Sequence, residues 1–167
     1  MIFLETDRLI LRNVKPSDAA VMYDYRNNEI CARYQRGQTR DPEGIRALVE
    51  SHGADVLGPD ANCLVAVERK ETGEMIGEII VMPNDDCFSL GYTFSCRHHR
   101  RGYAFEALSA LIGRLHEMEP DWEFVSFTDP ENIPSMNLLK KLGYEDLGYA
   151  PKVESQVFGK WIRENFL

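Results

Sequence analysis

The chain has 167 residues, of which 44% are hydrophobic and 28% are charged, and its formal net charge is −8. This length and composition predict one folded domain over residues 1–167 and exclude a disordered chain. The negative charge argues against general nucleic-acid binding, which needs a broad basic surface. Because no apolar run approaches the length of a membrane span and the first residues lack a signal-peptide pattern, we expect a cytoplasmic protein without membrane contact.

The first sixty residues predict one strand and then helices separated by polar loops. The predicted elements are a strand over residues 8–12, a helix that begins at Lys15-Pro16-Ser17-Asp18, a short helix or turn near residues 30–34, and a helix that begins at Asp41-Pro42-Glu43. Residues 33–41 and 53–62 are polar and rich in turn-forming residues. Because loops often carry binding residues, we expect these two to shape a substrate site.

The middle of the chain predicts three antiparallel strands followed by a long helix. The strands cover residues 64–67, 75–82 and 88–95 and are joined by two tight turns. In the third strand, large apolar residues alternate with small or polar ones, which is the period of a half-buried strand. Residues 102–118 then repeat apolar side chains at helical spacing along one face.

The last third of the chain predicts a strand, a helix and a hairpin. The strand covers residues 124–128, and because a helix separates it from the 88–95 strand, we expect these two strands to be parallel neighbours. A helix over residues 134–142 and a hairpin of residues 144–149 and 153–162 follow. Together the elements predict an α/β fold with a mixed, mainly antiparallel sheet of about six to seven strands and helices on both faces.

A basic turn separates the 88–95 strand from the long helix, and it consists of Arg97, His98, His99, Arg100 and Arg101, followed by Gly102. The first N–H groups of a helix have no partner inside the helix and lie at the positive end of its dipole. A glycine lets a ligand approach the backbone, and arginine side chains suit phosphate oxygens. We therefore expect a phosphate or pyrophosphate ligand here, the alternative being an ordinary solvated turn.

The cysteines give no sign of a metal site. Cys31, Cys63, Cys87 and Cys96 include no C-x-x-C pair. Cys96 is near two histidines, but residues so close together in one turn do not form a zinc site without distant ligands. We therefore expect reduced thiols and no bound metal.

Three segments resemble the GNAT superfamily of acyl-CoA-dependent N-acyltransferases, and within it the ribosomal-protein-alanine N-acetyltransferase branch. They are residues 5–12, the basic turn over residues 97–104, and residues 132–144, which contain an N-x-x-S start and a K-L-G-Y ending. They follow the family's order and span nearly the whole chain. The resemblance implies a GNAT-like fold and an acetyl-CoA-dependent N-acetyltransferase, in which a primary amine attacks the thioester directly.

The resemblance also implies which residues bind the acyl donor. Arg97 takes the first position of the family's pyrophosphate loop, Gly102 its second glycine and Ala104 its last small residue. The cradle would be formed by the backbone N–H groups of His98, His99, Arg100, Arg101, Gly102, Tyr103 and Ala104. Arg100 stands where a glycine is usual, so either its backbone is strained at positive φ or its φ is ordinary and its side chain reaches a phosphate.

Thioester attack needs a donor for the developing oxyanion, and in this family a strand amide is the implied source. A backbone N–H of Tyr92, Thr93 or Phe94 would serve where the sheet splays. The acceptor amine is left open, as a protein N-terminus or a small molecule. The oligomeric state is also left open, as a monomer or a homodimer. We expect no nucleic-acid partner.

The departing thiolate needs a proton donor. Leu139 occupies a position where many family members carry a tyrosine, so Ser135 is the nearest hydroxyl that the resemblance offers. The alternative is that Ser135 satisfies backbone groups of its own helix. Asn132 is similarly divided between a helix cap and a contact with the pantetheine arm.

Glu78 is the expected general base. By strand alternation it shares a face with Ile76, Ile80 and Met82, which is an unusual place for a carboxylate unless it lines a cleft. The alternative is a glutamate at the end of the sheet that reaches water. A second function class, a CoA-binding sensor or regulatory domain that has lost turnover, is favoured slightly by Leu139 and by Arg100.

Overall fold

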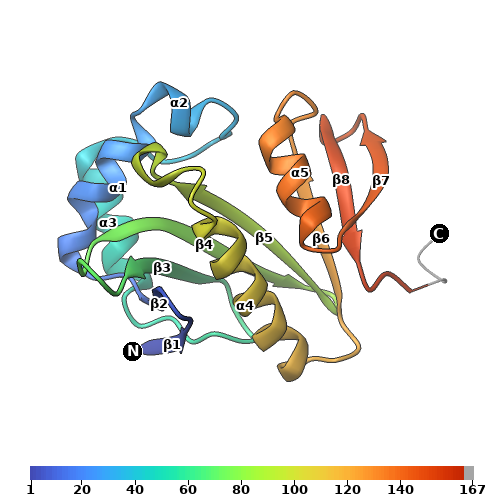
Figure 1. The fold of residues 1–167 in the computed structure, drawn as a ribbon, viewed down its shortest axis with the longest axis horizontal. Coiled ribbons are helices and arrows are strands. Elements are labelled where there is room, and N and C mark those ends of the chain that lie inside the picture. Colours follow the sequence, from blue (N-terminus) through green and yellow to red (C-terminus); the bar gives the residue numbers. More distant parts are fainter. Residues whose placement is uncertain (164–167) are drawn as a thin grey trace.

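Eight strands form one mixed sheet in the order β1-β2-β3-β4-β5-β6-β8-β7 in the computed structural model, which describes residues 1–163 (Figure 1). The strands are β1 Ile2–Glu5, β2 Leu9–Asn13, β3 Cys63–Arg69, β4 Met75–Asn84, β5 Cys87–Phe94, β6 Glu123–Thr128, β7 Glu145–Ala150 and β8 Ser155–Lys160. Neighbouring strands are antiparallel except β5 and β6, which are parallel as predicted. The predicted fold class is confirmed, with a sheet slightly larger than expected.

The helices are α1 Ala19–Arg26, α2 Glu29–Ala32, α3 Pro42–His52, α4 Tyr103–Met118 and α5 Ile133–Lys141, with short 3-10 turns η1 Pro16–Asp18 and η2 Cys96–His98. Helices α3 and α5 begin at the predicted capping residues, Asp41 and Asn132. The Asp41 carboxylate accepts the N–H of Gly44 at 2.8 Å, which satisfies one free donor of the first turn of α3. Among the described residues, no helix is long and apolar enough to span a membrane.

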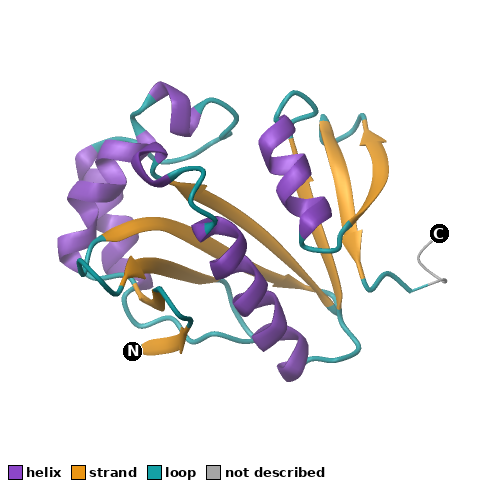
Figure 2. Cartoon of the chain, viewed as in Figure 1, coloured by secondary structure: helices purple, strands orange, loops and turns teal. Residues whose placement is uncertain are grey.

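Helices cover both faces of the sheet, as Figure 2 shows by element type. On one face, α4 and α5 bury a core with the inward residues of the central strands, including Val65, Ile79, Leu111, Phe124 and Leu139. On the other face, α1 and α3 bury a second core that includes Met22, Tyr25, Ile45, Val49 and Leu64. The sheet therefore separates two compartments, and the functional residues have to be assigned to one or the other.

Two features of the sheet were not predicted. Strand β1 is only four residues long and pairs with β2 alone. The C-terminal hairpin forms as predicted, but its second strand, β8, lies between β6 and β7. A hairpin pattern specifies the pairing within the hairpin and not which of its strands joins the sheet, so this choice depends on tertiary packing.

Strands β5 and β6 pair at one end only. Residues 87–89 of β5 pair with residues 123–125 of β6, after which β6 continues beside β8 and β5 continues beside β4. Figure 1 shows the two strands diverging beyond this short contact. The split leaves the second half of β5, residues 90–94, with a neighbour on one edge only.

Candidate active site

The basic turn adopts left-handed backbone at two residues. Arg100 has φ 63° and Gly102 has φ 79°, directly before the first residue of α4. Of the two alternatives for Arg100, the structure therefore shows the strained one, since a residue with a Cβ rarely adopts positive φ. Gly102 adopts the same region without that cost.

The turn leaves a consecutive run of backbone donors free. Among residues 1–163, no acceptor lies within hydrogen-bond distance of the N–H groups of residues 100–105. The N–H of His98 is bonded to the Ser95 carbonyl at 3.0 Å and that of His99 to the Cys96 carbonyl at 3.4 Å. The first two amides of the expected cradle, those of His98 and His99, are therefore not free donors, whereas the free run continues to Phe105.

The side chains of the turn divide between buried and exposed ones. His98 is buried with its Nε2 3.5 Å from Glu74, and burial lowers the pKa of this imidazole. The His99 ring bonds the Phe94 carbonyl at 2.9 Å. Arg97 is exposed beside Asp24 at 3.5 Å, and Arg100 and Arg101 are exposed. The exposed arginines belong to the same turn as six free amides at the start of α4, and this donor set fits a diphosphate.

The first loop of the chain holds the turn in place. The Glu106 carboxylate accepts the Thr6 hydroxyl at 2.8 Å, and it accepts the Arg8 backbone N–H at 3.0 Å and the Arg8 Nε at 2.7 Å. Arg8 also donates to the Arg101 carbonyl at 2.9 Å. We call Thr6, Arg8 and Glu106 the latch. The latch gives a physical reason for finding the segment 5–12 and the basic turn in the same chain, because Thr6 and Arg8 orient the turn and the first residues of α4.

A cavity of about 230 Å³ lies beside the split between β5 and β6. Its lining includes three predicted site residues, Tyr92, Asn132 and Ser135, and it also includes Leu139. The Asn132 side chain accepts the Ser135 N–H at 3.3 Å, so Asn132 is a helix cap as one alternative held. The Ser135 hydroxyl lies 2.8 Å from the Tyr92 hydroxyl, so it does not serve only its own helix.

Tyr92 offers both a side-chain and a backbone group to this cavity. Burial raises the pKa of the Tyr92 phenol, partly offset by the hydrogen bond with Ser135, so the phenol stays protonated. The Ser95 N–H bonds the Ile76 carbonyl at 2.8 Å, and antiparallel pairing alternates from there along β5. The Tyr92 and Phe94 amides therefore point away from β4 toward the split, whereas the Thr93 amide points at β4 and is not an available donor.

Glu78 lies on the other face of the sheet, in a closed ion pair. The Arg26 guanidinium donates to both carboxylate oxygens, at 2.8 and 2.7 Å, and the Tyr25 hydroxyl donates at 2.8 Å. Only 4% of Glu78 is exposed. Burial, and then the charge of Glu78, raises the pKa of Tyr25 well above its usual range. The carboxylate expected as a base is thus already occupied by three donors.

The expected neighbours of Glu78 are partly wrong because of a β-bulge. The register between β3 and β4 shifts so that Val67 faces Gly77 while Glu68 faces Met75, which leaves Ile76 as the extra residue. Ile76 consequently packs with the core under α4, while Ile80 packs with the core under α1 and α3. Strict alternation along β4 therefore fails between Ile76 and Glu78.

A second cavity, of about 280 Å³, lies on the Glu78 side of β5. It shares Gln35, Arg36, Gly91 and Tyr92 with the first cavity, so the two meet at the edge of β5. Its floor contains the cross-strand row of Leu64, Ile80 and Gly91, and its walls come from α1, α3 and the 35–39 loop. Two groups can thus approach each other from opposite faces of the sheet near Tyr92.

The comparison with known families agrees with this geometry. The family model described as Acetyltransferase (GNAT) domain matches residues 8–145. The chain belongs to the GNAT family of N-acetyltransferases. Among its sequence relatives, the uncharacterized N-acetyltransferase YnaD of Bacillus subtilis (strain 168) is 24% identical over 157 residues, covering 89% of this chain and 86% of YnaD. The uncharacterized protein YkkB of the same strain is 27% identical over 144 residues, covering 84% and 83%.

Solved structures show the same GNAT fold. A GNAT-family acetyltransferase from Bacillus anthracis superposes with a TM-score of 0.80 at 19% identity, covering 95% of this chain and 96% of that chain. RimL, a ribosomal L7/L12 alpha-N-protein acetyltransferase solved in complex with coenzyme A, superposes with a TM-score of 0.78 at 14% identity, covering 96% and 97%. Because the identities are below 25%, these superpositions show a shared fold and nothing more, and the shared fold covers nearly the whole chain.

Several residues of the second cavity of this GNAT chain were not predicted as site residues. Arg26, Gln38 and His52 line it, and Gln38 donates to the Thr93 hydroxyl at 3.1 Å. Gln38 and His52 lie in or beside the two loops expected to shape a substrate site, whereas Arg26 is the last residue of α1 and had no such sequence signal. Among the described residues, no group of three or more His, Cys, Asp or Glu side chains is arranged to hold a metal.

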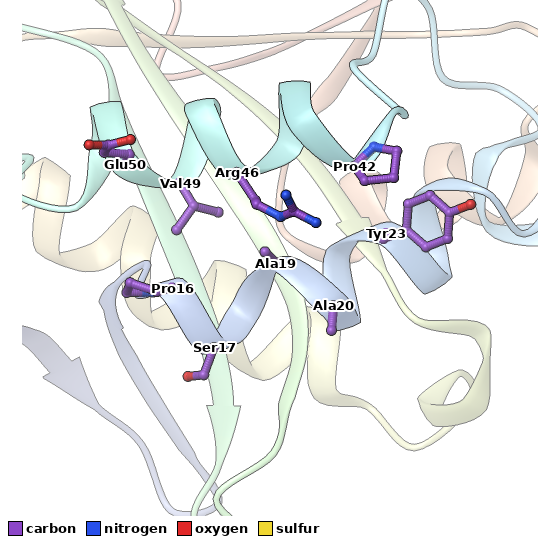
Figure 3. A pocket seen from close by; sticks show the side chains of 9 residues that line it. All are labelled: Pro16, Ser17, Ala19, Ala20, Tyr23, Pro42, Arg46, Val49 and Glu50. Atoms are coloured by element: carbon purple, nitrogen blue, oxygen red, sulfur yellow. The ribbon is translucent and has the colours of Figure 1, made fainter.

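A larger cavity of about 700 Å³ lies outside this site, between α1 and α3 (Figure 3). Figure 3 shows Ala19, Ala20 and Tyr23 of α1 on one side of it and Arg46 and Val49 of α3 on the other. It shares no lining residue with the two cavities at β5. Two alanines, Ala19 and Ala20, are part of the α1 side of this groove, and none of the predicted site residues lies in it.

Proposed function

We propose that this chain transfers an acetyl group from acetyl-CoA to a primary amine by direct attack of the amine on the thioester. The observation that carries the proposal is the run of six unpaired amides, residues 100–105, beside a sheet that splits at β5. Free amides at a helix N-terminus bind phosphate groups, and the split provides space for an extended arm. Membership of the GNAT family supports the same chemistry.

The acyl donor would be held at two points. The amides of residues 100–105 would bind its diphosphate, with Arg97, Arg100 and Arg101 adding charge around them. The cavity lined by Tyr92, Asn132 and Ser135 would receive the rest of the arm. Acetyl-CoA supplies the activated acyl group, and rigid binding at both points would align it with the amine, which can be worth several kcal/mol.

Tyr92 would contribute in two ways. Its backbone N–H, directed toward the split, would stabilise the charge that develops on the thioester oxygen. Its hydroxyl, bonded to that of Ser135, would supply the proton that the departing sulfur takes up. A tyrosine from β5 would thereby replace the hydroxyl that Leu139 lacks on α5. Because a thiol has a pKa of about 8.5, a weak acid is enough for this step.

The amine would occupy the cavity on the other face of the sheet. There Glu78 would act as the anchor of Arg26 and Tyr25, because its oxygens are already engaged. Two structural neighbours, RimL and the ribosomal-protein-S5-alanine acetyltransferase from Vibrio fischeri, are named for protein acceptors, so peptide α-amines come first among the acceptors to test.

Calorimetric titration with acetyl-CoA, followed by an assay of CoA release on an amine panel, tests the proposal. The panel contains a peptide with a free N-terminus, a polyamine, an aminoglycoside and a free amino acid. We expect binding and turnover on at least one of them. Binding without turnover on any amine would instead support the CoA-binding sensor, and absence of binding would overturn both functions.

A further inference from the structure

We propose that His52, held by Asp55, accepts the proton that the attacking amine loses, an inference that rests on the proposed function. The carboxylate expected to do this, Glu78, is closed off by Arg26 and Tyr25. His52 is the last residue of α3 and lines the same cavity as Glu78 and Tyr92. One ring nitrogen of His52 has no hydrogen-bond partner among residues 1–163, and the side chain is part of the lining of this cavity.

The His52 ring is oriented by a fixed carboxylate. Its Nδ1 lies 2.6 Å from Asp55 Oδ2, and the same oxygen accepts the Leu64 N–H at 2.8 Å. The Asp55 backbone is itself held, because its N–H bonds the His52 carbonyl at 3.2 Å and its carbonyl accepts the Asn13 side chain at 2.9 Å. Since the carboxylate accepts only, Nδ1 carries the proton of the neutral ring and Nε2 keeps its lone pair.

The second nitrogen, Nε2, is available. Within residues 1–163 no hydrogen-bond partner lies on Nε2, and it is not among the buried atoms that lack a partner, so it is reached from outside the protein. The His52 side chain is 23% exposed, consistent with a ring that forms part of a cavity wall. An imidazole with one nitrogen fixed by a carboxylate and the other open is a suitable proton acceptor.

The other charged groups of the cavity do not compete with His52 for the proton. Arg26 and Glu78 neutralise each other at 2.7 Å, and Arg36 is paired with Asp129 at 3.1 Å. Asp55, which faces the imidazole from the loop after α3, stabilises the imidazolium once it forms. His52 is thus the remaining side chain of this lining that can take a proton and keep a counter-charge.

The proton and bond balance is complete without another reactant. The ammonium form of the acceptor gives one proton to His52 Nε2 and becomes a neutral amine. The amine nitrogen then forms a bond to the acyl carbon while the carbon–sulfur bond breaks, with the electron pair leaving on sulfur. A second proton passes from nitrogen to the sulfur through the hydroxyls at Tyr92 and Ser135, and the His52 proton is released to solvent.

The test is the pH profile of kcat/KM for wild type and His52→Gln with two acceptor amines of different pKa. We expect one limb in the wild type whose midpoint does not move with the pKa of the amine, because it belongs to the enzyme. In His52→Gln we expect that limb to be absent and kcat/KM to fall about 10²-fold, the usual contribution of a general base. The Kd for acetyl-CoA should not change, because His52 does not line the donor cavity.

His116→Gln is the matched control, since this histidine lies on α4 stacked against Trp161 and lines neither cavity. If His52→Gln does not fold, His52→Ala with added imidazole replaces it, and we expect imidazole to restore the rate. A fall of less than tenfold, an unchanged enzyme limb, or the absence of rescue overturns the role of His52 alone. No turnover by the wild type on any amine overturns the proposed function and this inference together.

Discussion

The two sides of β5 use polar groups in opposite ways. On the donor side, the amides of residues 100–105 and of Tyr92 face the open site without a protein partner. On the acceptor side, Glu78, Arg26 and Tyr25 close on one another, and Thr93 is bonded to Gln38. In the proposed function the donor side would bind through backbone groups, which substitution of a side chain does not remove. The acceptor side depends on side chains, and these can differ between related enzymes.

The difference also separates affinity from stability. An amide that faces water costs little when it is unpaired, whereas a buried carboxylate is costly unless it is paired. Substitutions on the donor side should therefore change ligand binding, and substitutions in the Glu78 cluster should change the free energy of unfolding. Variants of each side make this contrast testable, in the order of the effect expected.

Arg26→Met should have the largest effect. It leaves the buried Glu78 carboxylate without its cation, and breaking such a pair costs about 3–5 kcal/mol. Urea denaturation measures the free energy of unfolding. Arg26→Met combined with Glu78→Leu should recover most of the loss, because it removes the unpaired charge. A loss below about 1 kcal/mol for the single variant would mean that water reaches the cluster and would erase the contrast.

Gly102→Val should come next and act mainly on binding. A side chain at φ 79° enters the cradle of free amides, although the nearest atom, Arg8 Nη2 at 3.5 Å, is at ordinary contact distance. We expect the Kd for acetyl-CoA to rise at least about tenfold, or roughly 1.4 kcal/mol, in calorimetry.

Gly73→Val is the matched control for Gly102→Val. Gly73 has φ 69° in the turn between β3 and β4, and no neighbouring atom lies within 4 Å of the position that a Cβ would take there. Its backbone strain is the same, about 1–2 kcal/mol, but its acetyl-CoA affinity should match the wild type. Equal affinities for the two variants would show that the turn does not bind the donor.

Tyr92→Phe should lower kcat about tenfold with little change in the KM for the amine, because it removes a hydroxyl that acts only on the departing sulfur. The backbone N–H of residue 92 remains, so part of its contribution is retained. Steady-state kinetics on the best amine of the panel measures both constants. Tyr149→Phe, at an exposed tyrosine of β7, is the control, and an equal loss in both variants would contradict the assignment.

Glu106→Gln should have the smallest effect, about 1 kcal/mol at neutral pH, because Arg8 is half exposed and solvent screens the pair. Burial alone would raise the pKa of Glu106, but hydrogen bonds from Arg8 and Thr6 outweigh it and lower the pKa from its ordinary 4.5. Because the pKa of Glu106 is lower in the folded than in the unfolded state, this carboxylate stabilises the fold at pH values above its unfolded pKa. The stabilisation is lost as the pH falls through the pKa of the folded state. The difference in melting temperature should therefore vanish in acid.

Local signals predicted most of the fold and the free backbone donors at the start of α4, whose ligand stays a prediction. Strand alternation, the apolar face of α4 and the glycine at position 102 each depend on residues that are close together in the sequence. The position of β8 between β6 and β7 could not be predicted in this way, because the pattern of residues 144–162 is the same for either order.

The acceptor side was less predictable because its contacts join distant segments. Glu78 was recognised as a carboxylate among apolar residues, but its partners Tyr25 and Arg26 lie more than fifty positions away. The bulge at Ile76 also broke the alternation from which its neighbours were deduced. His52 and Asp55 are close in sequence, yet only the packing of α3 against β3 brings them to the cavity.

The latch gives ligand binding a consequence at the far edge of the sheet. Thr6 and Arg8, in the loop between β1 and β2, bond Glu106 in the first turn of α4. A ligand that orders the start of α4 should therefore also order this loop. Strand β1 has one neighbour only, and such edge strands are where sheets fray and recruit foreign chains. Occupancy by the acyl donor should thus protect the enzyme from self-association through an edge that the donor never touches.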